Sequence, residues 1–242
     1  MRILITNDDG IESIGLKILA MAAIKHGEVI VIAPAKEQSA KSQALNIRRG
    51  LPYKKIANYL PNITCYAVDS TPADCVRFAQ YFLRDEFDIV FSGINNGYNL
   101  GEDILYSGTV GAASEGVMCG KKAIAFSTAP HSFDEVKDKI DEVLAFIFEK
   151  NLLEYNDFYN INIPKKATSF KYTIQGSTHF ETYFFEEGLQ VFQRGTPNFH
   201  LDEKKQDSDV YAIYQNYISI TPLTVDRTNH QVFLKITKDL II

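Results

Sequence analysis

Short apolar runs alternate with amphipathic stretches from the N-terminus to about residue 150. The apolar runs are rich in β-branched and aliphatic residues, as expected of buried parallel strands. Each is followed by a segment with helical spacing, and this alternation is typical of βαβ units around a parallel sheet. The predicted strands cover residues 3–5, 29–32, 65–68, 89–91 and 123–126.

Three amphipathic helices are predicted around these strands. The first begins near residue 14, the second follows Ser70-Thr71-Pro72, and the third covers residues 133–150. Thr71 offers a capping hydroxyl, and proline suits the first position of a helix. The residues expected to face the sheet are Ile14, Ile18, Met21 and Ala22 in the first helix, Val76, Phe78, Ala79 and Phe82 in the second, and Val136, Ile140, Val143, Leu144 and Ile147 in the third.

Beyond about residue 153 the chain changes to aromatic and β-branched segments separated by glycine and proline, which predict strands over residues 158–163, 181–186, 189–194 and 217–221. The many aromatic side chains need a surface that buries them, either the chain's own core or a subunit interface. We therefore expect a doubly wound, mostly parallel, Rossmann-like α/β core over residues 1–165. A β-rich C-terminal arm, residues 166–242, is expected to belong to the same domain.

Composition narrows the function classes. The formal charge is −5, and no run of Lys or Arg is longer than a pair, which argues against a nucleic-acid-binding surface. The first acids come too early for a signal peptide, and no apolar stretch approaches the ~18 residues that span a membrane, so a cytoplasmic location is expected. Three cysteines without C-x-x-C spacing favour neither a disulfide framework nor a zinc knuckle.

Asp8 and Asp9 follow the first predicted strand directly, on a tight turn that ends at Gly10. In open α/β sheets, ligands bind at the carboxyl ends of the strands. Two adjacent carboxylates repel each other unless a cation or a basic group neutralises them, and the loop that follows holds no Lys or Arg. The alternative is that one acid caps the next helix and the other is solvated.

Two further loops present oxygen ligands after predicted strands: Ser39 follows the second strand, and Asn95 and Asn96 follow the fourth. Carboxylate, hydroxyl and amide oxygens suit a hard cation such as magnesium, manganese or calcium. Taken singly, Ser39 or Asn95 is better explained as a turn residue that bonds its own backbone. Only their joint placement at strand ends favours a metal site.

The glycine-rich segment 92–103 leads into Tyr106–Gly111 and a small-residue helix over residues 112–118. The hydroxyls of Ser107 and Thr109, together with free amides at a helix N-terminus, make a cradle for an anion such as phosphate. Such turns also occur for packing alone. No Gly-Lys-Ser/Thr follows, so a triphosphate-binding P-loop is disfavoured.

Several long motifs, in register over nearly the whole chain, resemble the survival protein E (SurE) family of metal-dependent nucleoside-monophosphate phosphatases. The motifs lie at residues 6–11, 33–34 with 37–39, 71–76, 92–95 through 106–112, 159–164, 207–210 and 217–223. Two positions depart from the family pattern. Ala40 stands where a glycine is usual, and Asn96 stands where a basic or small residue is common, which leaves the base preference and the loop geometry open.

The resemblance implies a site, a cofactor and an assembly. Asp8, Asp9, Ser39 and Asn95 are expected to bind one divalent cation per subunit, Mg²⁺ or Mn²⁺, with Ca²⁺ as a substitute in crystals. A homodimer or homotetramer is expected, in which the C-terminal arm is exchanged between subunits. The residues expected to line the substrate and phosphate site are Asn96, Asn99, Ser107, Gly108 and Thr109.

We interpret the chain as a 5′- or 3′-nucleotidase in which a metal-held water attacks the phosphorus. Asp8 and Asp9 are the catalytic residues, and either could orient or deprotonate the water. A rival enzyme mechanism makes Asp8 a covalent nucleophile that forms an aspartyl-phosphate. A rival from another class is a phospho-accepting signalling receiver with Asp69 as acceptor. That module needs a lysine after the fifth strand, whereas Lys121 and Lys122 precede it, and the chain is about twice the length such a module requires.

Overall fold

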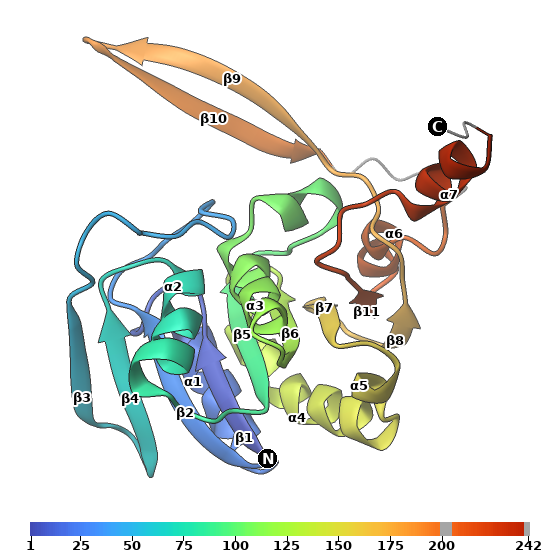
Figure 1. Cartoon of the computed structure of the whole chain (residues 1–242). Helices are drawn as coiled ribbons and strands as arrows, with labels where there is room; N and C mark the ends of the chain where they lie inside the picture. The colour runs from blue at the N-terminus through green and yellow to red at the C-terminus, as the bar shows by residue number, and fades with distance from the viewer. Residues whose placement is uncertain (199–204, 240–242) are drawn as a thin grey trace.

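The structure, a computed structural model, describes residues 1–198 and 205–239 (Figure 1). The strands are β1 (Arg2–Thr6), β2 (Glu28–Pro34), β3 (Tyr53–Leu60), β4 (Ile63–Val68), β5 (Ile89–Asn96), β6 (Lys122–Thr128), β7 (Phe158–Ile163), β8 (Ser169–Tyr172), β9 (His179–Glu187), β10 (Gln190–Asn198) and β11 (Tyr217–Pro222). The helices are α1 (Ile14–Ala23), α2 (Pro72–Arg77), the π-helix η1 (Phe78–Leu83), the 3-10 helix η2 (Gly101–Leu105), α3 (Gly108–Met118), α4 (Phe133–Glu149), α5 (Leu152–Tyr155), α6 (Asp209–Tyr214) and α7 (His230–Asp239).

A nine-stranded sheet of order β3-β4-β2-β1-β5-β6-β7-β11-β8 forms the centre of the molecule. Strands β4, β2, β1, β5, β6 and β7 run parallel, while β3 pairs antiparallel with β4 and β11 antiparallel with β7. The chain moves from β1 outward to β4 and then returns to β5 on the other side of β1. The doubly wound, mostly parallel class is confirmed, and its topological switch point lies between β1 and β5.

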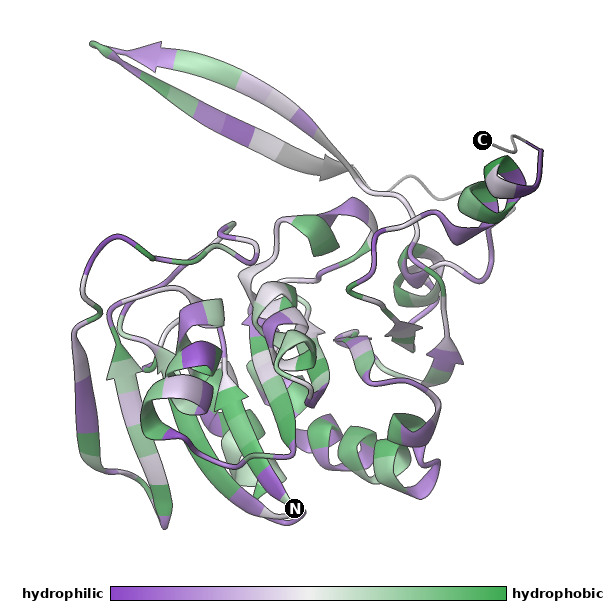
Figure 2. Cartoon of the chain, in the orientation of Figure 1, coloured by the Kyte–Doolittle hydropathy of each residue, from purple (hydrophilic) through white to green (hydrophobic). Residues whose placement is uncertain are grey.

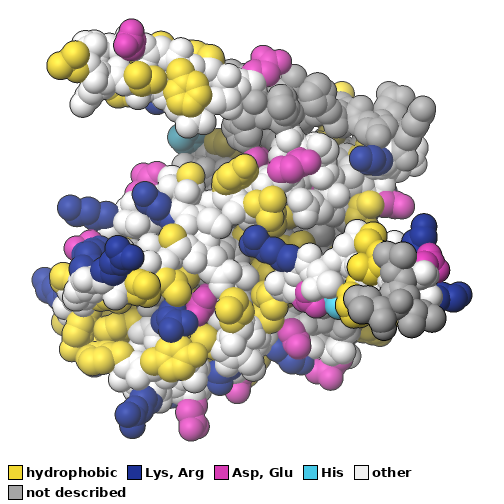
Figure 3. Space-filling view, turned by 45° about the horizontal axis from the view of Figure 1, so that its top comes forward, with side chains coloured by type: hydrophobic (Ala, Val, Ile, Leu, Met, Phe, Trp, Pro, Cys, Tyr) yellow, Lys and Arg dark blue, Asp and Glu magenta, His cyan; other side chains and the backbone are white. Residues whose placement is uncertain are grey.

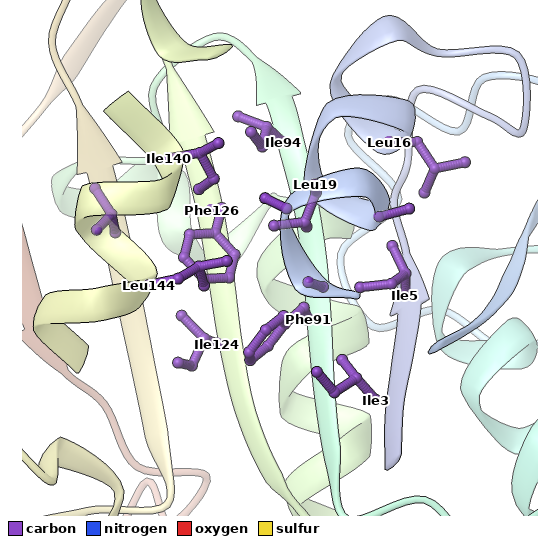
Figure 4. Packing of buried hydrophobic residues seen from close by; sticks show 14 of the residues in the cluster. Ile3, Ile5, Leu16, Leu19, Phe91, Ile94, Ile124, Phe126, Ile140 and Leu144 are labelled. Atoms are coloured by element: carbon purple, nitrogen blue, oxygen red, sulfur yellow. The ribbon is translucent and has the colours of Figure 1, made fainter. Parts of the chain in front are cut away.

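Helices cover both faces of the sheet. Because successive strand residues point to opposite faces, Ile3 and Ile5 pack with α1 and α4, whereas Leu4 packs with α2 and α3. Figure 4 shows the first of these two cores, in which the Phe91 and Phe126 rings meet edge to face, 5.4 Å apart. Burial on both faces explains why these strands are apolar runs rather than alternating ones.

The predicted inner face of the first helix is right for Ala22, which is buried, and for Ile18, which packs against the core, but wrong for Ile14 and Met21. Ile14 and Met21 are 59% and 39% exposed, while Leu16 and Leu19 are fully buried. The sequence of α1 is apolar almost all round, so its spacing does not single out one face. In the second helix, the α-helical turns end at Arg77 and a π-helix follows, which leaves Phe82 57% exposed instead of buried.

The C-terminal part contains more than the predicted strands. Residues 181–186 and 189–194 lie in the hairpin β9–β10, which forms a second sheet and projects from the body (Figure 1). Its hydrophobic positions are coloured green in Figure 2, and hydrophobic side chains stand out on it in Figure 3. Tyr183 and Phe184 are 56% and 65% exposed, so the chain's own core does not bury them. Strands β3 and β8 and helices α6 and α7 were not predicted. Over the described residues, no helix combines the length and hydrophobicity needed to cross a membrane.

Gly15 lets α1 lie directly on β5, since a Cβ there would be 2.0 Å from the Ile94 carbonyl oxygen and 2.8 Å from the Phe133 ring. We expect Gly15→Ala to lower the free energy of unfolding by about 1–3 kcal/mol, despite the ~1 kcal/mol gain in helix propensity. Urea unfolding measures the change. Gly50→Ala, where the added carbon would have no neighbour within 4 Å, is the control. An unchanged or more stable Gly15→Ala protein would contradict the packing.

Candidate functional site

Three loops meet at the carboxyl edge of the sheet, beside the switch point. The turn of Asp8 and Asp9 follows β1, the loop of Ser39 follows β2, and Asn96 ends β5. The Gln38 N–H donates a hydrogen bond to the Asp8 carbonyl oxygen at 2.7 Å, and the Asn96 N–H donates to Asp9 Oδ2 at 3.2 Å. The structure therefore brings together the three loops that the sequence singled out.

The turn after β1 is closed by Asn7, which leaves both aspartates free for other partners. Asn7 Nδ2 donates to the Gly10 carbonyl at 3.0 Å, and the Gly10 N–H donates back to Asn7 Oδ1 at 3.2 Å. Helix α1 begins only at Ile14, with Ser13 as its N-cap residue. The alternative that one aspartate caps this helix is therefore wrong.

Asp8 is almost fully buried against the first turn of α3. The Thr109 hydroxyl donates a hydrogen bond to its carboxylate. A Cβ on Gly108 would lie 2.8 Å from Asp8 Cβ and 3.0 Å from Asp8 Oδ2, so only glycine permits this close approach. Burial raises the Asp8 pKa to about 6, the Thr109 bond opposes the rise, and the charge of Asp9 adds to it.

Asp9 is more accessible than Asp8, and its environment contains a residue that the sequence analysis missed. Burial raises the Asp9 pKa, and the nearby carboxylate of Glu37 raises it further, while the Asn96 N–H opposes both effects. Glu37 thus adds a third acid to this edge of the sheet. Among the described residues, no Lys or Arg forms an ion pair with Asp8, Asp9 or Glu37.

The predicted metal ligands Ser39 and Asn95 lie in these loops but bond to other groups. The exposed Ser39 hydroxyl donates to Glu37 Oε1 at 2.5 Å. Asn95 Nδ2 donates a hydrogen bond to the Gly97 carbonyl at 2.8 Å, which leaves the Asn95 amide oxygen available as a metal ligand. Ala40 has a φ of 55°, in the left-handed region that favours glycine. The glycine usual at this position in the family is thus explained by the backbone.

Three of the predicted phosphate residues, Ser107, Gly108 and Thr109, form the N-terminus of α3, while Asn96 ends β5 and Asn99 lies in the loop after it. Ser107 is the N-cap residue of α3 and accepts a hydrogen bond from the Val110 N–H at 3.1 Å. The first amides of a helix have no partner within it: that of Thr109 is directed at the Asp8 carboxylate, and that of Gly108 is available to an anion. Asn99 is only 6% exposed, and its side chain donates to Ser127 Oγ at 2.8 Å. Asn96 points its side-chain oxygen at the His131 N–H, 2.9 Å away.

Two buried asparagines behind Asn99 were also missed as part of the site. Asn160 and Asn162 lie on β7, and both donate to the Asn99 carbonyl oxygen, at 2.8 and 3.0 Å. The sequence contained an indication of their role, because the two asparagines alternate with apolar residues in a strand-like segment. The structure shows all six positions of this strand to be buried. Buried amides need dedicated partners, so their place in a core strand indicates a polar contact across the sheet edge.

Fold and site together define a doubly wound α/β protein with paired aspartates at its switch point, facing the N-terminus of a helix. A family model described as "Survival protein SurE" matches residues 3–182. The chain belongs to the SurE family, as its motifs predicted.

Relatives resemble the chain over nearly its whole length. It is 36% identical to "5'-nucleotidase SurE" of Pelotomaculum thermopropionicum, with 98% of this chain and 95% of the relative covered. It is also 36% identical to the protein of the same name from Legionella pneumophila, covering 96% of this chain and 94% of the relative. The crystal structure of the SurE protein from Aquifex aeolicus superposes with a TM-score of 0.80 at 31% identity, covering 98% of this chain and 99% of that one.

The raised pKa of Asp8 has a consequence for stability without metal. The pKa is about 6 in the folded state and 3.8 as an ordinary carboxyl, so the folded state binds this proton more tightly and loses stability as the pH rises between the two values. Asp8→Asn removes the buried charge but keeps the shape. In chelator at pH 7.5 we expect it to exceed the wild type in unfolding free energy by on the order of 2–3 kcal/mol.

Urea titrations at pH 7.5 and pH 4, both in chelator, measure this difference. The gap should largely close at pH 4, where Asp8 is protonated in the folded state and close to half-protonated as an ordinary carboxyl. Asp69→Asn is the control, because that side chain is 50% exposed and faces Arg49. An Asp8→Asn protein that is less stable than the wild type at pH 7.5 would contradict the burial argument.

Proposed function

We propose that this chain is a nucleotidase that hydrolyses nucleoside monophosphates to a nucleoside and phosphate. The observation that carries the proposal is the contact of the Asp8 carboxylate with Gly108 and Thr109 at the start of α3. It places an acidic pair and an anion-binding helix terminus beside each other, as a charged phosphoryl group and its counter-ion require. The relatives named 5'-nucleotidase, aligned over nearly the whole chain, support the same activity.

The donor set fits one hard divalent cation. It consists of the carboxylates of Asp8 and Asp9, the Ser39 hydroxyl and the free amide oxygen of Asn95, which are all oxygens on loops that meet at one edge. Both aspartates have raised pKa values because of burial, which is the expected state of a cation site without its cation. We expect Mg²⁺ or Mn²⁺ here, with Ca²⁺ as a substitute in crystals. When bound, such an ion lowers the pKa of a water and draws charge from a phosphoryl oxygen.

The chain's own groups bind and orient the phosphate. We expect the Gly108 amide and the side chains of Ser107 and Asn99 to donate hydrogen bonds to its oxygens, while Thr109, whose hydroxyl donates to Asp8, lines the site. Water attacks the phosphorus opposite the ribose oxygen and loses a proton, the bond from phosphorus to that oxygen breaks, and the ribose oxygen takes up a proton to leave as a hydroxyl. Asp8 and Asp9 are the groups placed to take up the proton of the water.

The nucleoside has space beside Ser107. A cavity of about 430 Å³ lies between α3 and the segments that follow β8 and β11, and its lining includes Ser107 but neither aspartate. Its wall combines polar groups, including Gln43, Ser114 and Arg227, with apolar ones such as Met118. This mixture of polar and apolar groups suits a ribose and a base.

Sheet order argues against the receiver alternative. Asp69 follows β4, and β2 separates β4 from the strand that carries Asp8 and Asp9. Asp69 is instead bonded to the Arg49 side chain, which donates to its carbonyl oxygen at 2.9 Å. The aspartyl-phosphate mechanism differs from ours only in the nucleophile, so trapping with beryllium fluoride and inspection for a bond to Asp8 distinguishes the two.

Release of inorganic phosphate from AMP tests the activity directly. We expect turnover with Mg²⁺ or Mn²⁺ and none in excess chelator. Asp8→Asn should lower kcat/KM by about 10²-fold or more because the site loses a charge that acts on the reacting groups. Asp69→Asn should match the wild type. Full activity of Asp8→Asn, or undiminished activity in chelator, would refute the proposal.

We also propose that the C-terminal arm joins subunits into a homodimer or homotetramer, and that the protein acts in the cytoplasm. One face of the projecting hairpin is aromatic, with the Phe185 and Phe192 rings stacked 5.5 Å apart and Tyr183 next to them. An apolar face that stands away from its own core is typical of a protein interface.

Light scattering after size exclusion tests the arm. We expect the wild type to have the mass of two or four chains, and the double variant Phe185→Ser, Phe192→Ser to have a lower mass, because the apolar contact is lost. Phe184→Ser, on the opposite face of the same strand, is the control and should keep the wild-type mass. A monomeric wild type would contradict the assembly.

A further inference from the structure

The backbone of Asn99 is held on both sides by buried side-chain amides of β7. Asn162 Oδ1 accepts a hydrogen bond from the Asn99 N–H at 2.9 Å, and Asn162 Nδ2 donates to the Asn99 carbonyl oxygen at 3.0 Å. Asn160 Nδ2 donates to the same oxygen at 2.8 Å. Both backbone groups of one loop residue are thus fixed by side chains that come sixty residues later in the chain.

Two more buried groups complete the set. Ser127 on β6 accepts the hydrogen bond of the Asn99 side chain, which fixes the direction of that amide. Asp209, the first residue of α6, accepts from the Gly101 N–H at 3.0 Å and, with its other oxygen, from the Gly176 N–H at 2.8 Å. We call Ser127, Asn160, Asn162 and Asp209 the Asn99 clamp, and all four are fully buried.

A purely structural role for these residues does not account for where their bonds go. Buried polar groups in a core are costly unless they are bonded, and they can satisfy one another, as Thr173, Ser219 and Thr221 do on the neighbouring strands. The clamp residues instead form hydrogen bonds with the loop that carries Asn99. The segments around residues 160 and 209 belong to the motifs that resemble the family, yet the metal and phosphate ligands use neither.

We propose that the clamp residues are positioning residues for the phosphate site. They touch none of the reacting atoms: Ser127, Asn160 and Asn162 bond Asn99 itself, and Asp209 bonds the Gly101 N–H two residues further along the same loop. This inference rests on the proposed function, because it assigns to Asn99 a contact with the phosphate of the substrate. Displacing a group in an active site by about 1 Å can lower the rate by up to about 10²-fold, so loss of the rigid support for Asn99 should have a measurable effect on the rate.

The matched pair Ser127→Ala and Ser219→Ala tests the proposal. Both serines are fully buried strand residues with a hydroxyl bonded at 2.8 Å, Ser127 to Asn99 and Ser219 to Thr173. We expect Ser127→Ala to lower kcat/KM for AMP by about tenfold and to raise the inhibition constant of inorganic phosphate in the same proportion. Ser219→Ala should stay within about twofold of the wild type in both.

Inorganic phosphate is the informative probe because a merely structural role would change the melting temperature of both variants but not the phosphate affinity of either. Asn162→Asp is the second variant, since it keeps the acceptor for the Asn99 N–H but turns a carboxylate towards the Asn99 carbonyl. We expect the same phosphate defect in this protein if it folds. If it does not fold, Ser127→Ala decides the question alone.

The proposal is overturned if Ser127→Ala keeps the wild-type kcat/KM and phosphate inhibition, or if Ser219→Ala loses as much as Ser127→Ala. Calorimetric titration of the wild type with phosphate distinguishes failure of the clamp proposal from failure of the proposed nucleotidase function. A wild type that binds phosphate but hydrolyses no nucleoside monophosphate refutes the nucleotidase. The clamp is then supported if Ser127→Ala binds phosphate more weakly and overturned if it binds equally. A wild type that neither binds phosphate nor hydrolyses a nucleotide refutes both.

Discussion

The contact of Asp8 with the first turn of α3 is the constraint on which the rest of the structure depends. A carboxylate is buried there with one hydroxyl donor, Thr109, and with a glycine at the point of closest approach. Such an arrangement is unfavourable for a folded protein on its own, because a buried charge lacks the solvation that water provides. It is favourable only when a cation or a proton occupies the site. The fold therefore holds an uncompensated buried carboxylate at its switch point, and a bound cation can neutralise it.

Much of this centre can be predicted from the sequence because the information is local. A strand buried on both faces must be apolar, and the residue that follows it must lie at the sheet edge, so Asp8, Ser39 and Asn95 are located once the strands are. The clamp residues Ser127 and Asn162 could not be assigned in the same way. Their role depends on β6 and β7 lying next to β5, which is a property of the tertiary arrangement and not of any single segment.

The errors have a common physical origin. The predictions for Ile14, Met21 and Phe82 were wrong because hydrophobic spacing reports burial only where polar residues mark the opposite face, and a π-helix changes the spacing itself. Edge strand β3 is mostly exposed and contains two lysines, so it lacks the apolar signal of the inner strands. Helix α7 is amphipathic, yet all its described side chains are exposed. A sequence pattern indicates that a face is to be covered but not which chain covers it.

Asp209 connects the two parts of the molecule that the sequence had separated at residue 165. One oxygen of its carboxylate accepts from Gly101, in the loop of Asn99, and the other accepts from Gly176, just before the hairpin β9–β10. Glu102 reinforces the link by accepting hydrogen bonds from Ser177 and Thr178. Because the Asp209 side chain bonds both segments, a shift at the base of the hairpin would disturb the carboxylate that also holds Gly101 in the loop of Asn99. An arm held in place by a partner subunit would thereby hold the site in place as well.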